Sequence, residues 1–134
     1  MNTDLELFAR NWAKVYVLPM EDGFKGAYDI ERDAIYLSDR LTDVQHKCVL
    51  AHELSHARHG DCGCRNGHDA AELRADIEAA RMLIDQADYM NAERCCDNPS
   101  WIASELGVTP DLILAYRCWL HDTIPNFYQN NLVD

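Results

Sequence analysis

The pentad His52-Glu53-Leu54-Ser55-His56 has the residue types and spacing of a metal-dependent hydrolase. Residues four apart lie on one face of a helix, so both imidazoles can bind the same metal ion. Glu53 lies about 100° around the helix from His52, where it can reach a water molecule on that ion. Its carboxylate can take a proton as the water attacks a carbonyl carbon, and can then pass it to the leaving amine. The pentad predicts His52 and His56 as metal ligands and Glu53 as general base; a surface helix with two ordinary histidines is the alternative.

A catalytic zinc ion has three protein ligands and one open position, so the pentad needs a third ligand. Glu72 and Asp76 are also four residues apart, in the next predicted helix. If the two helices form a hairpin, Glu72 can bind the metal, and Asp76 can accept a hydrogen bond from the far nitrogen of a ligand histidine. This arrangement would hold one Zn2+ per chain. An acidic helix face in contact with solvent is the alternative interpretation of Glu72 and Asp76.

Other residues near the pentad compete for the third ligand position. His59 follows the pentad by three residues and Asp61 by five. A longer zinc motif, with a third histidine six residues after the pentad, is absent because Cys62 occupies that position. We expect His59 to form a local hydrogen bond at the end of its helix, and His46 and His68 to lie on the surface.

The group that would stabilise the oxyanion of such a reaction is left open by the sequence. Three polar side chains are candidates: Tyr28, Tyr36 and His121. A cysteine nucleophile is disfavoured because no local cysteine motif accompanies the histidines.

Two helices must position the candidate metal ligands. Thr42 and Gln45 have the spacing of a capping box, which predicts a helix from this point to about His59, and Gly60 is suited to end it. The second helix is expected over residues 69–88, where apolar residues recur at helical spacing. A turn-rich segment, Asp61–Gly67, connects the two helices.

Shorter elements are predicted on both sides of this helix pair. A helix is expected over Leu5–Val17, followed by a β-hairpin of Ala27–Ile30 and Ala34–Ser38. Downstream, two helices are expected over about residues 100–106 and 110–120, and the tail over residues 125–134 is expected to be loose.

The two downstream helices resemble a helix-turn-helix, but they are not expected to bind DNA. The second of them carries Arg117 as its single fixed positive charge, whereas phosphate contacts need several. The whole chain has 23 acidic and 12 basic residues, a net charge of −11, which disfavours nucleic acids and anionic membranes as partners.

Length and patterning indicate one domain, residues 1–134, with a core over about residues 5–90 and a helical extension over about residues 99–121. The expected fold class is α+β and mainly helical, with a small antiparallel sheet packed on the helix pair. The sequence has no apolar run of about 20 residues, and its N-terminus lacks the pattern of a signal peptide. We therefore expect a cytoplasmic protein.

The six cysteines are expected to be reduced thiols, since nothing indicates a secreted protein. Cys48 and Cys118 lie in apolar helical patterns and are expected in the core. Four others lack a usual zinc-ligand spacing, and their role stays open: Cys62, Cys64, Cys95 and Cys96.

The segments Ala51–Ala57, His59–Asp61 and Glu72–Asp76, together with the hairpin around Gly26-Ala27-Tyr28, resemble the ImmA/IrrE family of metallopeptidases. This resemblance spans roughly residues 5–90. The chain departs from the family pattern at Glu78, where a phenylalanine is common. It departs again where Ile84-Asp85 replaces a Met-Pro pair, and both changes concern packing rather than ligands.

The resemblance implies a zinc site in which His52, His56 and Glu72 are the ligands, Glu53 is the base and Asp76 lies behind a ligand. Members of the family are often found in phages and mobile elements, and they typically cleave a helix-turn-helix repressor. The resemblance therefore implies a zinc endopeptidase with a protein substrate. The alternative is a non-catalytic antirepressor or adaptor whose zinc is structural, and a regulatory DNA-binding protein is a third, disfavoured reading.

Overall fold

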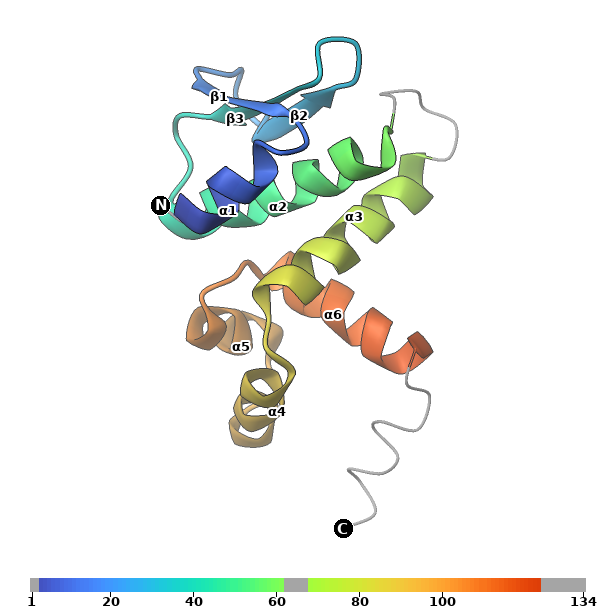
Figure 1. Cartoon of the computed structure of the whole chain (residues 1–134). Coiled ribbons are helices and arrows are strands. Elements are labelled where there is room, and N and C mark those ends of the chain that lie inside the picture. The colour runs from blue at the N-terminus through green and yellow to red at the C-terminus, as the bar shows by residue number, and fades with distance from the viewer. Residues whose placement is uncertain (1–2, 62–67, 124–134) are drawn as a thin grey trace.

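The computed structural model describes residues 3–61 and 68–123 (Figure 1). Its elements, in chain order, are α1 Thr3–Ala9, β1 Lys14–Leu18, β2 Gly26–Asp29, β3 Ala34–Ser38, α2 Asp43–His59, α3 His68–Leu83, α4 Gln86–Cys95, α5 Pro99–Leu106 and α6 Pro110–Thr123. The described residues form a mainly helical α+β fold with a small sheet, as the sequence predicts.

The three strands form a mixed sheet in the order β1-β3-β2. The predicted hairpin is confirmed, because β2 pairs antiparallel with β3 and Ala27 lies opposite Tyr36. The first strand, β1, pairs parallel with β3, so the sheet is not wholly antiparallel. The central strand β3 is buried except at Tyr36, and the sheet lies against α2.

The expectation of one helix over Leu5–Val17 is wrong beyond Ala9. The run Val15-Tyr16-Val17 is rich in β-branched and aromatic side chains, which favour a strand, and β3 supplies the pairing partner. Phe8 and Trp12 are 42% and 43% exposed, so they do not form the continuous buried helix face that the spacing predicts.

The helix α2 begins and ends where the sequence predicts. The Thr42 hydroxyl accepts a hydrogen bond from the Gln45 backbone N–H at 3.1 Å, and the Gln45 side chain accepts one from the Thr42 N–H at 3.0 Å. Gly60 adopts the left-handed conformation, with φ of 63°, and ends the helix. The buried side chains of α2 pack against both the sheet and α3.

The predicted helix over residues 69–88 is two helices, because α3 ends at Leu83 and α4 begins at Gln86. The reason is Asp85, whose extended backbone interrupts the helix and whose carboxylate accepts a hydrogen bond from the Asp88 N–H at 3.1 Å. A similar cap begins α5, where the Asn98 side chain accepts from the Trp101 N–H at 3.1 Å.

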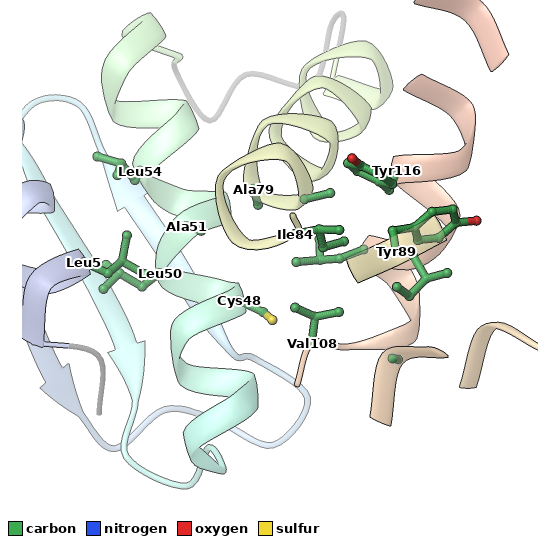
Figure 2. Close-up of a cluster of buried hydrophobic side chains, with 14 of the residues drawn as sticks. Leu5, Cys48, Leu50, Ala51, Leu54, Ala79, Ile84, Tyr89, Val108 and Tyr116 are labelled. Atoms are coloured by element: carbon green, nitrogen blue, oxygen red, sulfur yellow. The ribbon is translucent and has the colours of Figure 1, made fainter. Parts of the chain in front are cut away.

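One cluster of buried side chains contains residues from all six helices, and Figure 2 shows part of it between α2, α3 and α6. The helix α6 packs against α3 on the side away from the sheet (Figure 1). Cys48 is buried in this cluster, as expected, whereas Cys118 is exposed. Cys118 falls on the outer face of α6, while its neighbours Tyr116 and Leu120 point into the core.

Candidate metal centre

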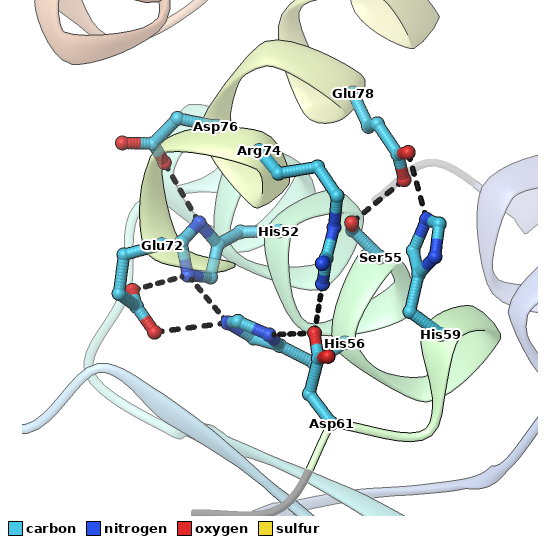
Figure 3. A network of polar contacts seen from close by, with 9 residues as sticks. All are labelled: His52, Ser55, His56, His59, Asp61, Glu72, Arg74, Asp76 and Glu78. Atoms are coloured by element: carbon cyan, nitrogen blue, oxygen red, sulfur yellow. Dashed lines mark hydrogen bonds and ion pairs between the residues drawn. The ribbon is translucent and has the colours of Figure 1, made fainter. Parts of the chain in front are cut away.

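Two imidazoles on α2 and one carboxylate on α3 converge where these helices pack (Figure 3). The Nε2 atoms of His52 and His56 lie 3.2 Å apart. Glu72 places Oε2 2.9 Å from Nε2 of His52 and Oε1 3.0 Å from Nε2 of His56. Among the described residues, these three side chains are the group whose ligand atoms all lie within 4.8 Å of one another.

The spacing of these atoms fits a zinc ion. Zinc ligands lie about 2.0–2.1 Å from the ion at tetrahedral angles, which places the ligand atoms about 3.3 Å from each other. The two nitrogens lie 3.2 Å apart, which is close to that value. One Glu72 oxygen lies 2.9 Å from Nε2 of His52 and the other lies 3.0 Å from Nε2 of His56, so the carboxylate is near enough to share an ion with both rings. Two histidines and a glutamate are also a known donor set of catalytic zinc sites.

The far nitrogen of each histidine contacts its own carboxylate. Nδ1 of His52 lies 2.7 Å from Oδ1 of Asp76, and Nδ1 of His56 lies 2.8 Å from Oδ2 of Asp61. A carboxylate beside Nδ1 favours the tautomer with the proton on Nδ1, which leaves the lone pair on Nε2. With both rings in this neutral form, three electron-pair donors converge, and a cation among them would remove their mutual repulsion.

The charges around this group favour a positive charge at its centre. Burial lowers the pKa of His52, but the hydrogen bond to Asp76 and the negative charges of nearby carboxylates outweigh it and raise this pKa to about 9. Burial disfavours the ionised form of Glu53 and raises its pKa, whereas the positive charges of His52 and His56 lower it by a smaller amount. Glu53 is 8% exposed, so its carboxylate is largely shielded from solvent.

A cavity of about 370 Å³ opens beside the candidate ligands. His52, Glu53, Glu72 and Asp76 line one part of it. The segment 23–26 and the start of α6, at Thr109, line other parts. A group bound between the ligands would therefore face a space large enough for part of a peptide.

Gly26 allows β2 to approach α2 closely at this cavity. A Cβ atom at Gly26 would lie 2.6 Å from Cγ1 of Val49, 3.1 Å from the carbonyl oxygen of Tyr36 and 3.4 Å from Cγ of Glu53. A side chain at position 26 would therefore push against the part of α2 that carries Glu53.

Two histidines outside the ligand group form contacts that sequence spacing did not predict. His46 is 6% exposed rather than on the surface, and its Nε2 lies 2.8 Å from Oε1 of Glu6, which joins α1 to α2. His59 contacts the neighbouring helix instead of its own helix end, with Nε2 2.8 Å from Oε2 of Glu78. Glu78 also accepts a hydrogen bond from the Ser55 hydroxyl at 2.7 Å, so it ties α3 to α2.

Asp61 lies behind His56 rather than among the candidate ligands. Its Oδ2 contacts Nδ1 of His56 and also accepts a hydrogen bond from Arg74 of α3. Burial raises the pKa of Asp61, but the hydrogen bond from His56 and the charge of Arg74 lower it below its usual value. The signal in the sequence is the pair Gly60-Asp61, an acidic residue directly after a helix-ending glycine.

The three oxyanion candidates do not line the cavity. The Tyr28 hydroxyl donates to Asp33 at 3.5 Å, Tyr36 stacks on Tyr16, and His121 is exposed. Of the cysteines without an assigned role, Cys95 is exposed and Cys96 is half-buried. Other predictions fall outside the described residues: those on Cys62, Cys64, the His68 side chain and the tail.

None of the described helices is both long enough and apolar enough to cross a membrane. A comparison with curated proteins finds no match. The family model of the IrrE N-terminal-like domain, Peptidase_M78, matches residues 14–117, from the first strand of the sheet into α6. This range contains both helices of the candidate metal centre. The chain therefore belongs to the IrrE N-terminal-like family of metallopeptidases, Peptidase_M78.

Proposed function

We propose that this chain is a zinc-dependent endopeptidase that acts in the cytoplasm on a helix-turn-helix repressor or a similar regulatory protein. The observation that carries the proposal is the convergence of His52, His56 and Glu72 beside a cavity that Glu53 lines together with His52 and Glu72. The chain's membership of a metallopeptidase family supports the same reading.

In this proposal His52, His56 and Glu72 hold the zinc ion. A bound zinc ion polarises a carbonyl group and lowers the pKa of water to about 7. The Glu53 carboxylate takes a proton from the attacking water and later gives it to the leaving amine. Glu53 follows His52 directly and lines the cavity, so its carboxylate lies where it could exchange a proton with a water molecule there.

The open side of the site favours a catalytic zinc ion over a structural one. A structural zinc site is closed by four protein ligands, whereas a catalytic site keeps one position free. The described residues supply three candidate ligands, and a cavity lies beside them. A non-catalytic antirepressor with a structural zinc is the other candidate function, and it needs neither this cavity nor Glu53.

The net charge supports a basic protein as the substrate. The chain has a net charge of −11, and DNA-binding repressors carry basic surfaces that contact phosphates. Opposite charges on two proteins increase their rate of association and favour correct partners. We therefore propose the repressor's basic surface as the feature that draws substrate to this chain.

The variant Glu53→Gln separates the two candidate functions. Purified wild-type and variant proteins are analysed for zinc content and incubated with helix-turn-helix repressors and a peptide library, with products identified by mass spectrometry. We expect about one zinc per chain in both proteins. Cleavage should fall on the order of 100- to 10,000-fold in the variant, because a general base contributes that much.

The result that contradicts an endopeptidase is a zinc-loaded wild-type protein without cleavage, together with full antirepressor activity in Glu53→Gln. A wild-type protein that binds no zinc contradicts the metal centre itself.

A further inference from the structure

We propose that Asp61 is a positioning residue of the metal centre, which holds the His56 ring from the end of α2 while Arg74 of α3 holds Asp61. The inference rests on the proposed zinc site. Glu72 already connects α3 to the histidines of α2, and Arg74 and Asp61 would form a second connection between these helices. It is carried by three contacts, all within the part of the chain that the structure describes (Figure 3).

The end of α2 brings Asp61 back onto His56. The Gly60 N–H donates to the carbonyl oxygen of Ala57 at 3.3 Å, and the Asp61 N–H donates to the carbonyl oxygen of His56 at 3.0 Å. This pair of bonds is a Schellman motif, in which the residue after the glycine folds over the residue five positions earlier. That side-chain contact is usually apolar.

Here the contact is a charged hydrogen bond instead. Oδ2 of Asp61 lies 2.8 Å from Nδ1 of His56. The backbone bond and the side-chain bond join the same two residues, so the helix end sets the position of the carboxylate. The left-handed φ of 63° at Gly60 makes this return of the chain possible.

Arg74 holds the other side of the same carboxylate. Its Nη2 donates to Oδ2 of Asp61, an ion pair whose carboxylate side chain is 20% exposed. Arg74 follows Glu72 by two residues on α3, so one helix reaches both nitrogens of the His56 ring. Glu72 approaches Nε2 directly, and Arg74 reaches Nδ1 through Asp61.

The physical effect is on the orientation and basicity of a ligand. A carboxylate that accepts the Nδ1 proton selects the tautomer with a free lone pair on Nε2 and restricts rotation of the ring. Loss of such a partner typically weakens metal binding about 10- to 100-fold. Asp76 has the equivalent place behind His52, so each candidate histidine ligand has a carboxylate of its own.

The test compares Asp61→Ala, Asp61→Asn and the control Glu78→Gln. Glu78 also connects α3 to α2, through Ser55 and His59, but it contacts none of the candidate ligands. Zinc affinity is measured by competition with a chromophoric chelator, and the ligand field is followed in the visible spectrum of the cobalt-substituted proteins.

We expect Asp61→Ala to weaken zinc binding about 10- to 100-fold and to change the cobalt spectrum. Asp61→Asn should fall between this variant and the wild type, because its amide oxygen accepts the Nδ1 proton without a negative charge. Glu78→Gln should keep wild-type affinity and spectrum.

The inference is overturned if both Asp61 variants have the zinc affinity and the cobalt spectrum of the wild type. That result would not contradict the proposed metal centre. An equal loss of affinity in Glu78→Gln also overturns it, because the effect is then a general loosening of the two helices. A wild-type chain that binds neither metal overturns the proposed function instead. If Asp61→Ala does not fold, Asp61→Asn carries the same comparison.

Discussion

His52 and His56 face each other through their Nε2 atoms, which lie 3.2 Å apart, while their Nδ1 atoms contact two different carboxylates. When both rings are neutral with the proton on Nδ1, each directs an electron pair toward the same point. The packing of α2 on α3 maintains this arrangement, because the carboxylate of Glu72 comes from α3. These three side chains together could hold a cation.

Replacement of Glu72 should remove the third ligand. We expect Glu72→Ala to lower zinc affinity by at least about 100-fold, because two imidazoles alone bind zinc weakly compared with three protein ligands. Zinc content after dialysis against a weak chelator is the measurement. The neighbouring variant Leu73→Ala is the control, since Leu73 is 49% exposed on the same helix. Full retention of zinc in Glu72→Ala would show that the ligand set is wrong.

Loss of the carboxylate behind His52 should have a smaller effect. Asp76 Oδ1 lies 2.7 Å from Nδ1 of His52, so Asp76→Ala removes the partner that orients this ring. We expect zinc affinity to fall about 10- to 100-fold, with the stoichiometry unchanged at saturating zinc. Competition titrations give both quantities. Stoichiometric zinc loss that excess zinc does not restore would instead make Asp76 a direct ligand.

A methyl group at Gly26 should strain the contact between the sheet and α2. The added Cβ would lie 2.6 Å from Cγ1 of Val49, so we expect Gly26→Ala to lower the free energy of unfolding by about 1–3 kcal/mol. Urea unfolding of the zinc-free protein measures this change. The double variant with Val49→Ala should cost less than the sum of the single changes, because it removes the crowded methyl group.

If Gly26→Ala and Val49→Ala have strictly additive effects on the free energy of unfolding, crowding against Val49 does not cause the loss of stability. Cleavage activity should fall together with stability in Gly26→Ala, because the crowded Val49 lies one helical turn before Glu53 on α2.

The contribution of Glu78 to stability should depend on pH. Burial raises the pKa of Glu78, but hydrogen bonds from Ser55 and His59 outweigh it and hold this pKa below its usual value. The folded state therefore has the lower pKa, so the stabilisation is complete above the unfolded-state pKa of about 4.3 and is lost as the pH falls through the folded-state value.

We expect Glu78→Gln to lower the free energy of unfolding by about 1 kcal/mol at neutral pH and by less in strongly acidic solution. Urea unfolding of the zinc-free wild type and variant on both sides of the glutamate pKa measures the difference. A difference that stays constant through the acid range would contradict the role of the ionised carboxylate.

Local spacing was enough to predict the helix that carries the pentad. The cap formed by Thr42 and Gln45 and the left-handed Gly60 depend on residues within four positions of each other, and the structure has them where the sequence places them. The relative positions of His52 and His56 follow from the same local rule, since residues four apart always share a helix face. The hairpin of β2 and β3 is local in the same sense.

Tertiary packing decided the features that join distant segments. The run after α1 is a strand because β3, about twenty residues later, offers it a partner, and this pairing outweighs the helical spacing of its apolar residues. His46 is buried because α1 brings Glu6 against it. The end of α2 places Asp61 against His56, which is a local contact. Arg74 contacts Asp61 only because α3 folds back along α2. Helix periodicity is set by neighbouring residues, whereas these contacts depend on which surfaces meet when the chain closes its core, and that is a property of the whole fold.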